Sequence, residues 1–311
     1  EILAKNFVLL RADDRRRRIR EGIQALTDGR DLQVNLDAEL LETLVFITEY
    51  PTPMLGEFDP SYLELPEEVL VTVMRHHQKY FSVEKGDGTL APNFIAVMNT
   101  AGDAEGLVRR GNERVLRARF NDARFFWDVD QKKTLAARVP ELEHVTFQAK
   151  LGSYLAKTQR AMTLVGELGG NEAAVRAVEL SKCDLTTELV KEFTELQGVV
   201  GGLYARAQGE PEEVSRAIYE HYKPVSMEDS IPSTVTGRLV SLADKLDTLR
   251  GCFGVGMVPS GSSDPFALRR AAQGVVKILV EGNLALPLAQ LTGQDAQLAE
   301  FFRDRIDYYF R

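Results

Sequence analysis

The chain has 311 residues, of which 44% are hydrophobic and 27% charged, a composition typical of a soluble globular protein of about two domains. No run approaches the ~18 consecutive apolar residues that a membrane helix needs, so no membrane partner is expected. The net charge of −8 excludes a uniformly basic nucleic-acid coat, although it allows a local basic surface. Two cysteines, Cys183 and Cys252, are too few for a disulfide framework and favour a cytoplasmic protein.

The first part of the chain shows both helical and extended patterns. Apolar residues at helical spacing predict helices over residues 11–29 and 38–48. Prolines and a glycine then break the pattern, so EYPTPMLGEFD is interpreted as an extended loop or strand. LPEEVLVTVMRHHQ predicts a short helix, and KYFSVEKGDGTLAPNFIAVMN predicts a β-hairpin with its turn at Gly86-Asp87-Gly88. A long helix is predicted over about residues 105–133.

Strand signals end near Val145, and about six helical segments are expected from there to the end. We therefore predict an α+β region over 1–145 and an all-α region over 146–311, predominantly helical overall. The chain lacks an initiating Met and stops within a helical pattern, FFRDRIDYYFR, so we interpret it as an internal fragment.

The stretch 107–127 carries two side-chain stripes at helical spacing. The apolar stripe is Leu116, Phe120, Ala123 and Trp127, and the basic stripe is Arg110, Arg114, Arg117 and Arg124. A row of guanidinium groups beside a buried face suits a phosphate backbone. The alternative is a solvated face paired with Glu113 and Asp122, which the pattern alone favours.

Two further clusters carry weaker signals. Six arginines lie between residues 11 and 20, but contiguous helical residues cannot all face one way, so at least half must be solvated. The adjacent histidines His76 and His77 point about 100° apart on a helix and do not easily chelate one ion. A capping or packing role is therefore favoured for them.

The helical half carries carboxylates on apolar faces. Asp184 falls on an inward face, and Asp244 and Asp247 lie one turn apart beside a leucine stripe. These carboxylates could hold a divalent cation, or could pair with Lys182, Lys245 or Arg250 or cap backbone groups, and the structural roles are favoured. The sequence has no GxxxxGK[ST] loop, no GxSxG elbow and no CxxC, so we expect no ATP site, catalytic residue or bound metal in this chain.

Four blocks in order resemble the β subunit of bacterial tetrameric glycine–tRNA ligase. They are HHQKYFSVEKGDGTLAPNFI (76–95), GNERVLRARFNDARFFWDVDQKK (111–133), LSKCDLTTELVKEFTELQGVVGGLYA (180–205) and SDPFALRRAAQGVVKIL (263–279). The resemblance implies a tRNA-binding, non-catalytic subunit of an α2β2 assembly, whose α subunit uses ATP and Mg to attach glycine to tRNA(Gly). It implies the later part of a B3/B4-like domain followed by an HD-like helical domain, without the anticodon-binding C-terminal region.

The HD comparison can be made residue by residue. HD phosphohydrolases bind metal through a His, an adjacent His-Asp pair and a distant Asp. Lys157 lies near the first His position, Cys183 and Asp184 lie at the pair, and Asp244 lies at the last position. Lysine cannot ligate as a cation, so we expect an HD scaffold without hydrolase chemistry, reused to hold RNA.

The resemblance also favours an RNA-binding role for the basic residues, because a tRNA-binding subunit with negative net charge must concentrate positive charge locally. The best candidates for phosphate contact are Arg110, Arg114, Arg117, Arg124, Arg269 and Arg270. Contact through shape and backbone to an acceptor stem is the default for RNA, with no DNA partner expected. Two alternatives stay open: a metal-dependent HD phosphohydrolase, and an assembly scaffold that never touches RNA.

Overall fold

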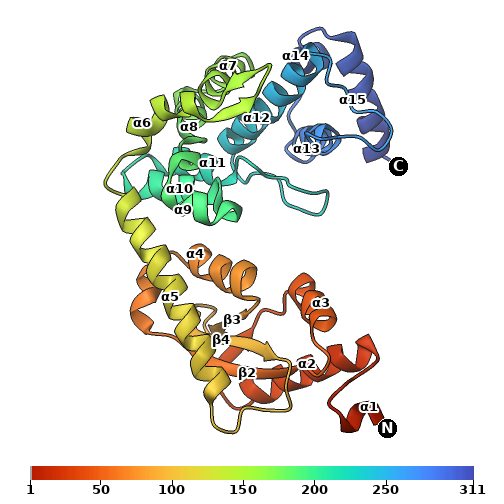
Figure 1. Ribbon diagram of the computed structural model, residues 1–311. Coiled ribbons are helices and arrows are strands. Elements are labelled where there is room, and N and C mark those ends of the chain that lie inside the picture. The colour runs from red at the N-terminus through yellow and green to blue at the C-terminus, as the bar shows by residue number, and fades with distance from the viewer. Residues whose placement is uncertain (1) are drawn as a thin grey trace. The chain divides into compact units, whose positions relative to one another are not determined.

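The computed structural model describes residues 2–311 and divides the chain into two compact units that meet between Asp128 and Val129 (Figure 1). The boundary expected near residue 145 stays a prediction. The first unit combines helices with a four-stranded sheet and the second is mainly helical, which confirms the expected α+β, predominantly helical fold.

The sheet of the first unit is antiparallel, in the order β1-β3-β4-β2. Its strands are β1 (Leu32–Val34), β2 (Thr52–Glu57), β3 (Phe81–Lys85) and β4 (Leu90–Met98). β3 and β4 form the predicted hairpin, in which the Lys85 N–H donates to the Thr89 carbonyl (2.8 Å) and Gly88 takes a φ of 81°. A positive φ at this position favours glycine.

Helices cover both faces of this sheet. The predicted N-terminal helices are α2 (Ala12–Thr27) and α3 (Ala38–Ile47), which follow the short α1 (Ile2–Lys5). Ile19 and Leu44, from α2 and α3, share a buried cluster with Phe81 and Ile95 of the sheet. Successive strand residues point to opposite faces of the sheet, so the Phe94 side chain lies on the other face from that of Ile95.

On that second face Tyr80 stacks on Phe94, with ring centroids 4.7 Å apart, and its hydroxyl donates to Asn112. Asn112 belongs to α5 (Leu107–Asp130), the long helix that the sequence predicts. Between β2 and β3 lie η1 (Pro60–Glu64), α4 (Glu67–Thr72) and a π-helical turn, η2 (Val73–Gln78).

The second unit is built around α12 (Val235–Gly254), the helix with the most buried residues in that unit (Figure 1). It packs against α7 (Tyr154–Glu167), α8 (Glu172–Leu180), α11 (Glu212–Glu220) and α13 (Leu268–Glu281). The remaining elements of the unit are α6 (Leu135–Arg138), η3 (Val139–His144), η4 (Cys183–Thr186), α9 (Glu188–Glu192), η5 (Thr194–Leu196), α10 (Val199–Ala207), α14 (Leu288–Thr292) and α15 (Ala296–Tyr309).

Two details of the second unit differ from the sequence prediction. The described residues after 145 hold nine α-helices, α7 to α15, rather than six, because several are a single turn or little more. They also hold a small antiparallel pair of strands, β5 (Thr146–Gln148) and β6 (Gly152–Ser153), too short to give a strand pattern. Among residues 2–311, none of the helices combines the length and the apolar character that a membrane span requires.

Candidate functional site

Asp244, on α12, is the centre of a buried charged cluster in the second unit. Its Oδ1 atom lies 3.2 Å from the Lys157 Nζ and 3.1 Å from the Lys182 Nζ. Lys157 comes from α7, and Lys182 comes from the turn between α8 and η4. Both lysines are buried, so two ammonium groups face one carboxylate away from bulk water.

Lys157 joins α7 to one face of α12. Its Nζ donates to the Thr248 Oγ1 (2.8 Å), the Asp244 carbonyl (2.9 Å) and the Asp247 Oδ2 (3.3 Å). These three acceptors are spaced i, i+3 and i+4, which places them on one helix face. Arg160, one turn further along α7, donates to the Asp247 Oδ1 at 2.7 Å. The two helices are therefore held by paired charges as well as by apolar contacts.

Lys182 extends the cluster to α11. Its Nζ lies 2.8 Å from the His221 Nε2, while the His221 Nδ1 lies 2.6 Å from the Ile218 carbonyl. A carbonyl only accepts, so Nδ1 carries the proton and Nε2 accepts from Lys182. Burial, together with the Lys182 charge, lowers the pKa of His221 to about 3, which keeps the ring neutral at neutral pH.

The charged groups of the cluster and their burial shift one another's pKa values. Burial alone would raise the pKa of Asp244, but the ammonium groups of Lys157 and Lys182 hold it well below its usual range. Lys245 donates to the Tyr222 and Lys223 carbonyls, both at 3.0 Å, and to the Ser241 hydroxyl at 2.9 Å. Burial lowers the pKa of Lys245 to about 8.

The Asp184 carboxylate caps backbone N–H groups. Its Oδ2 accepts from the N–H groups of Gly198 (2.5 Å) and Gly201 (3.3 Å), at the start of α10, where a carboxylate is favoured. Gly198 has a φ of 82°, and a Cβ there would lie 2.7 Å from the Tyr222 ring. Burial raises the pKa of Asp184 to about 6. The predicted backbone-capping role of Asp184 is therefore the one that the contacts describe.

The Cys183 thiol faces the backbone of α8. Its Sγ lies 3.7 Å from the Glu179 carbonyl, and burial raises the pKa of the thiol well above its usual range. A thiol that keeps its proton is a poor metal ligand.

The four HD-like positions therefore do not form a metal site. Lys157 and Asp244 lie together, but Lys182 rather than Cys183 or Asp184 reaches the Asp244 carboxylate. Across residues 2–311 no group of three His, Cys, Asp or Glu side chains is placed to hold a metal ion. A divalent cation needs ligands with lone pairs, and the groups closest to the Asp244 carboxylate are two ammonium ions, so these residues do not fit a metal.

The sequence prediction named Lys182 as a possible partner for the acidic residues and missed His221. Lys182 could be suspected because an inward carboxylate needs a cation. His221 carried no sequence signal, since nothing in its surroundings along the chain indicates contact with Lys182.

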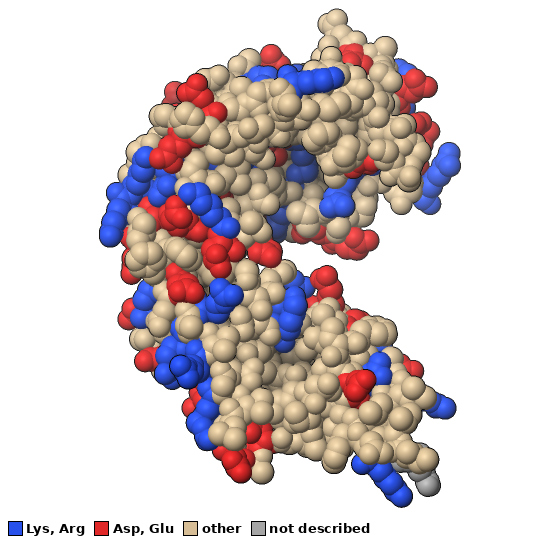
Figure 2. All heavy atoms as spheres, in the orientation of Figure 1, with Lys and Arg blue, Asp and Glu red and all other residues tan. Residues whose placement is uncertain are grey.

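The second candidate site is the outer face of α5, in the first unit. Arg110, Arg114 and Arg117 are exposed there, whereas Leu116 and Phe120 are fully buried on the adjacent face of the helix. At about 100° per residue the three arginines lie within an arc of about 60°. Their guanidinium groups make no hydrogen bond or ion pair in the part of the chain that the structure describes. Asp59 and Asp103 lie near enough to Arg117 and Arg110, respectively, for their charges to interact. Figure 2 shows blue side chains gathered along this helix.

The remaining predicted arginines differ in whether their guanidinium groups are hydrogen-bonded within the protein. Arg124 donates to the Ser61 carbonyl (2.6 Å) and lies over the Tyr62 ring at 4.5 Å, so its guanidinium is committed within the unit. Arg269, on α13, donates to the Gly261 carbonyl at 2.9 Å. Its neighbour Arg270 is exposed.

Comparison with known proteins places the chain in a family. A protein-family model described as "Glycyl-tRNA synthetase beta subunit" matches residues 1–311. The chain therefore belongs to the glycyl-tRNA synthetase beta subunit family. Proteins named glycine–tRNA ligase beta subunit from Acidobacterium capsulatum, Moorella thermoacetica and Phenylobacterium zucineum are 50%, 48% and 44% identical to it. The matches cover 96%, 93% and 99% of this chain but 46%, 43% and 47% of those relatives. The chain thus spans about half the length of the relatives it matches.

The ion cluster predicts a large effect of removing one ammonium group. Lys157→Met would leave two buried carboxylates short of a cation and lower the free energy of unfolding by about 3–5 kcal/mol. Urea unfolding at pH 7, followed by circular dichroism, measures this loss. Lys150→Met, at an exposed position, is the matched control and should change little. Equal midpoints for the two variants would contradict the role of Lys157.

The raised pKa of Asp184 predicts a pH-dependent stability. At a pH of about 4 and below, the carboxyl is protonated in both the folded and the unfolded chain. Between about pH 4 and pH 6 the unfolded chain loses the proton and the folded chain keeps it, so folding stability falls as pH rises. Asp184→Asn lacks this titration. The wild type should therefore lose stability relative to Asp184→Asn across this window in urea unfolding, while the exposed Asp122→Asn control should track the wild type.

Proposed function

We propose that this chain is part of the tRNA-binding, non-catalytic subunit of glycine–tRNA ligase, and that it supports the attachment of glycine to tRNA(Gly). In this proposal the catalytic α subunit uses ATP and Mg, and the present chain supplies RNA contacts and assembles with it as a heterotetramer. Family membership over the whole chain and the names of its relatives support the role of an aminoacyl-tRNA ligase subunit.

The observation that carries the RNA-binding part is the exposed, unengaged arginine face of α5. Arg110, Arg114 and Arg117 present three guanidinium groups along about two turns of helix. Glu113, which lies between Arg110 and Arg114 along the helix, makes its contacts elsewhere: its Oε1 accepts from the Glu57 N–H (3.2 Å) and lies 3.9 Å from Arg109. Guanidinium groups with free donors are suited to phosphate oxygens, which fix register and orientation on an RNA backbone.

The hydrolase alternative gains no support from the second unit. The groups closest to Asp244 are the ammonium ions of Lys157 and Lys182, which have no lone pair to offer a metal. The cytoplasmic location expected from the cysteine content stays a prediction.

Charge reversal on α5 tests the proposal. Arg114→Glu/Arg117→Glu should weaken binding of tRNA(Gly) and lower the slope of log affinity against log salt by about 2, because two phosphate contacts are lost. Filter binding of this chain to tRNA(Gly) and to an acceptor-stem minihelix, over a series of salt concentrations, gives both quantities.

The control makes the same change in charge elsewhere. Arg20→Glu/Arg303→Glu replaces two exposed arginines on α2 and α15 and should keep the wild-type salt slope. If both double variants lose affinity equally, the effect is one of net charge and α5 has no special role. If neither changes binding, the assembly-scaffold reading replaces RNA contact.

A further inference from the structure

A cavity of about 370 Å³ in the second unit lies beside the ion cluster and is not used by the proposed function. Its wall is formed by α12, by the start of α13 and by the segments that follow η5 and α11. Asp244 and Thr248 line it from α12, Tyr222 and Phe266 supply aromatic rings, and Arg270 stands at its edge. This volume falls within the range of small-molecule sites.

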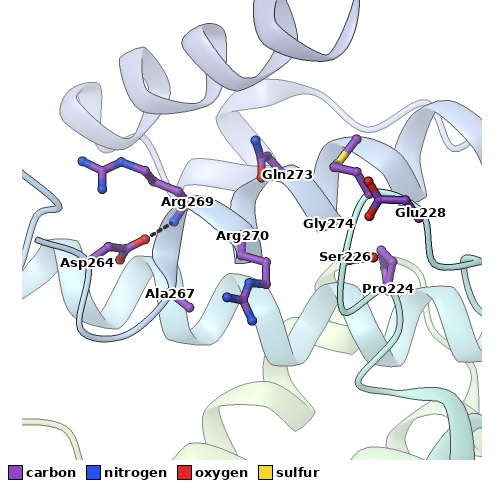
Figure 3. Close-up of a pocket in the computed structure, with 10 residues that line it drawn as sticks. Pro224, Ser226, Glu228, Asp264, Ala267, Arg269, Arg270, Gln273 and Gly274 are labelled. Carbon is purple, nitrogen blue, oxygen red and sulfur yellow. Dashed lines mark hydrogen bonds between the residues drawn. The ribbon is translucent and has the colours of Figure 1, made fainter. Parts of the chain in front are cut away.

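Arg270 is the one cationic side chain of this wall that is not committed to the protein. Within residues 2–311 its guanidinium makes no hydrogen bond or ion pair, whereas Arg269 donates to the Gly261 carbonyl. Figure 3 shows the two side chains leaving α13 in different directions. Arg270 also lines a neighbouring cavity of about 430 Å³, together with Pro224 and Ala267, so it stands where the two hollows adjoin.

The cavity wall carries charges of both signs. Asp244 and Glu195 supply carboxylates, and Lys245 supplies an ammonium group whose hydrogen bonds go to the Tyr222 and Lys223 carbonyls and the Ser241 hydroxyl. Arg270 adds a second positive charge at the cavity wall.

The Asp244 carboxylate keeps one acceptor available. Its Oδ1 is shared by two ammonium groups, while in the described residues its Oδ2 accepts no hydrogen bond. The side chain is 17% exposed and lines the cavity. A carboxylate in this situation accepts hydroxyl donors, as acidic residues do from ribose hydroxyls in dinucleotide sites.

Phe266 supplies the apolar part of the wall. It is 37% exposed, so its ring is accessible to a ligand in the cavity. Aromatic side chains next to a positive groove are the stacking platforms for unpaired bases. Arg, an aromatic ring and a free carboxylate oxygen thus match the phosphate, the base and the sugar of one nucleotide.

We propose that this cavity binds one ribonucleotide unit, with its phosphate on Arg270, its base against Phe266 and its ribose hydroxyls donating to Asp244. The unit is either a free nucleotide or the end of an RNA strand. The inference goes beyond the proposed function, because it needs no contact at α5.

Calorimetric titration of the 311-residue chain with adenosine 5′-monophosphate tests the proposal. Arg270→Gln should weaken binding about tenfold or more, since a bidentate charged contact to phosphate is lost. Arg269→Gln is the matched control, one residue away on the same helix, and should bind like the wild type. Circular dichroism of each variant checks that it is folded.

Three further arms separate the parts of the nucleotide. Phe266→Ala, at a partly exposed position, should weaken the nucleotide more than inorganic phosphate. The 2′,3′-dideoxy nucleotide should bind less tightly than the ribonucleotide, because it cannot donate to Asp244, and this measurement needs no variant. Binding of inorganic phosphate as tight as that of the nucleotide, or equal binding by Arg270→Gln and Arg269→Gln, would overturn the proposal.

The source of the nucleotide is resolved by competition. Stronger binding of a short single-stranded oligoribonucleotide with a free 3′ end supports an RNA strand, and stronger binding of the mononucleotide supports a free ligand. Arg114→Glu/Arg117→Glu should bind the mononucleotide normally. The α5 proposal and the cavity proposal can therefore fail independently.

Discussion

The second unit depends on one buried carboxylate that must stay charged. Taking Asp244 out of water carries a desolvation penalty of several kcal/mol, which only nearby cations can offset. Lys157 and Lys182 supply them at 3.2 and 3.1 Å. The cations need acceptors in turn, which they find in Thr248, His221 and the backbone of α12. The cluster thereby ties α7, the turn after α8, α11 and α12 to one point, and no member can leave without exposing the charge of another.

The same arrangement explains why the residues around Asp244 do not suit metal chemistry. A metal site needs neutral or anionic ligands that offer lone pairs, and the ion brings the positive charge. Here Lys157 and Lys182 carry the positive charge on the chain itself, so the carboxylate is neutralised when the protein folds. The Asp244 carboxylate therefore supports the packing of the helices. What stays open for a ligand is its second oxygen and the cavity beside it.

The predictable parts of the structure are those determined by neighbours along the chain. The β3–β4 hairpin follows from its turn residues, and the buried and exposed faces of α5 follow from their spacing. Asp184 shows what the sequence pattern cannot predict. Its inward position was predicted, but its partners are the Gly198 and Gly201 amides at the start of α10, which depend on how the intervening turn closes. His221 was not predicted at all, because its contact to Lys182 joins residues that are 39 apart.

Positive charge in the sequence is a poor guide to a binding surface until its acceptors are known. The arginine-rich start of α2 is the densest basic segment, yet Arg15 donates to the Leu9 and Val45 carbonyls and Arg18 to the Pro51 carbonyl. These guanidinium groups are hydrogen-bonded to backbone carbonyls within the unit. Arg114 and Arg117 belong to a less dense basic segment, but their guanidinium groups make no hydrogen bond or ion pair among the described residues, so their donors remain available. The number of uncommitted donors, rather than the number of arginines, therefore determines where a protein of negative net charge can contact phosphate.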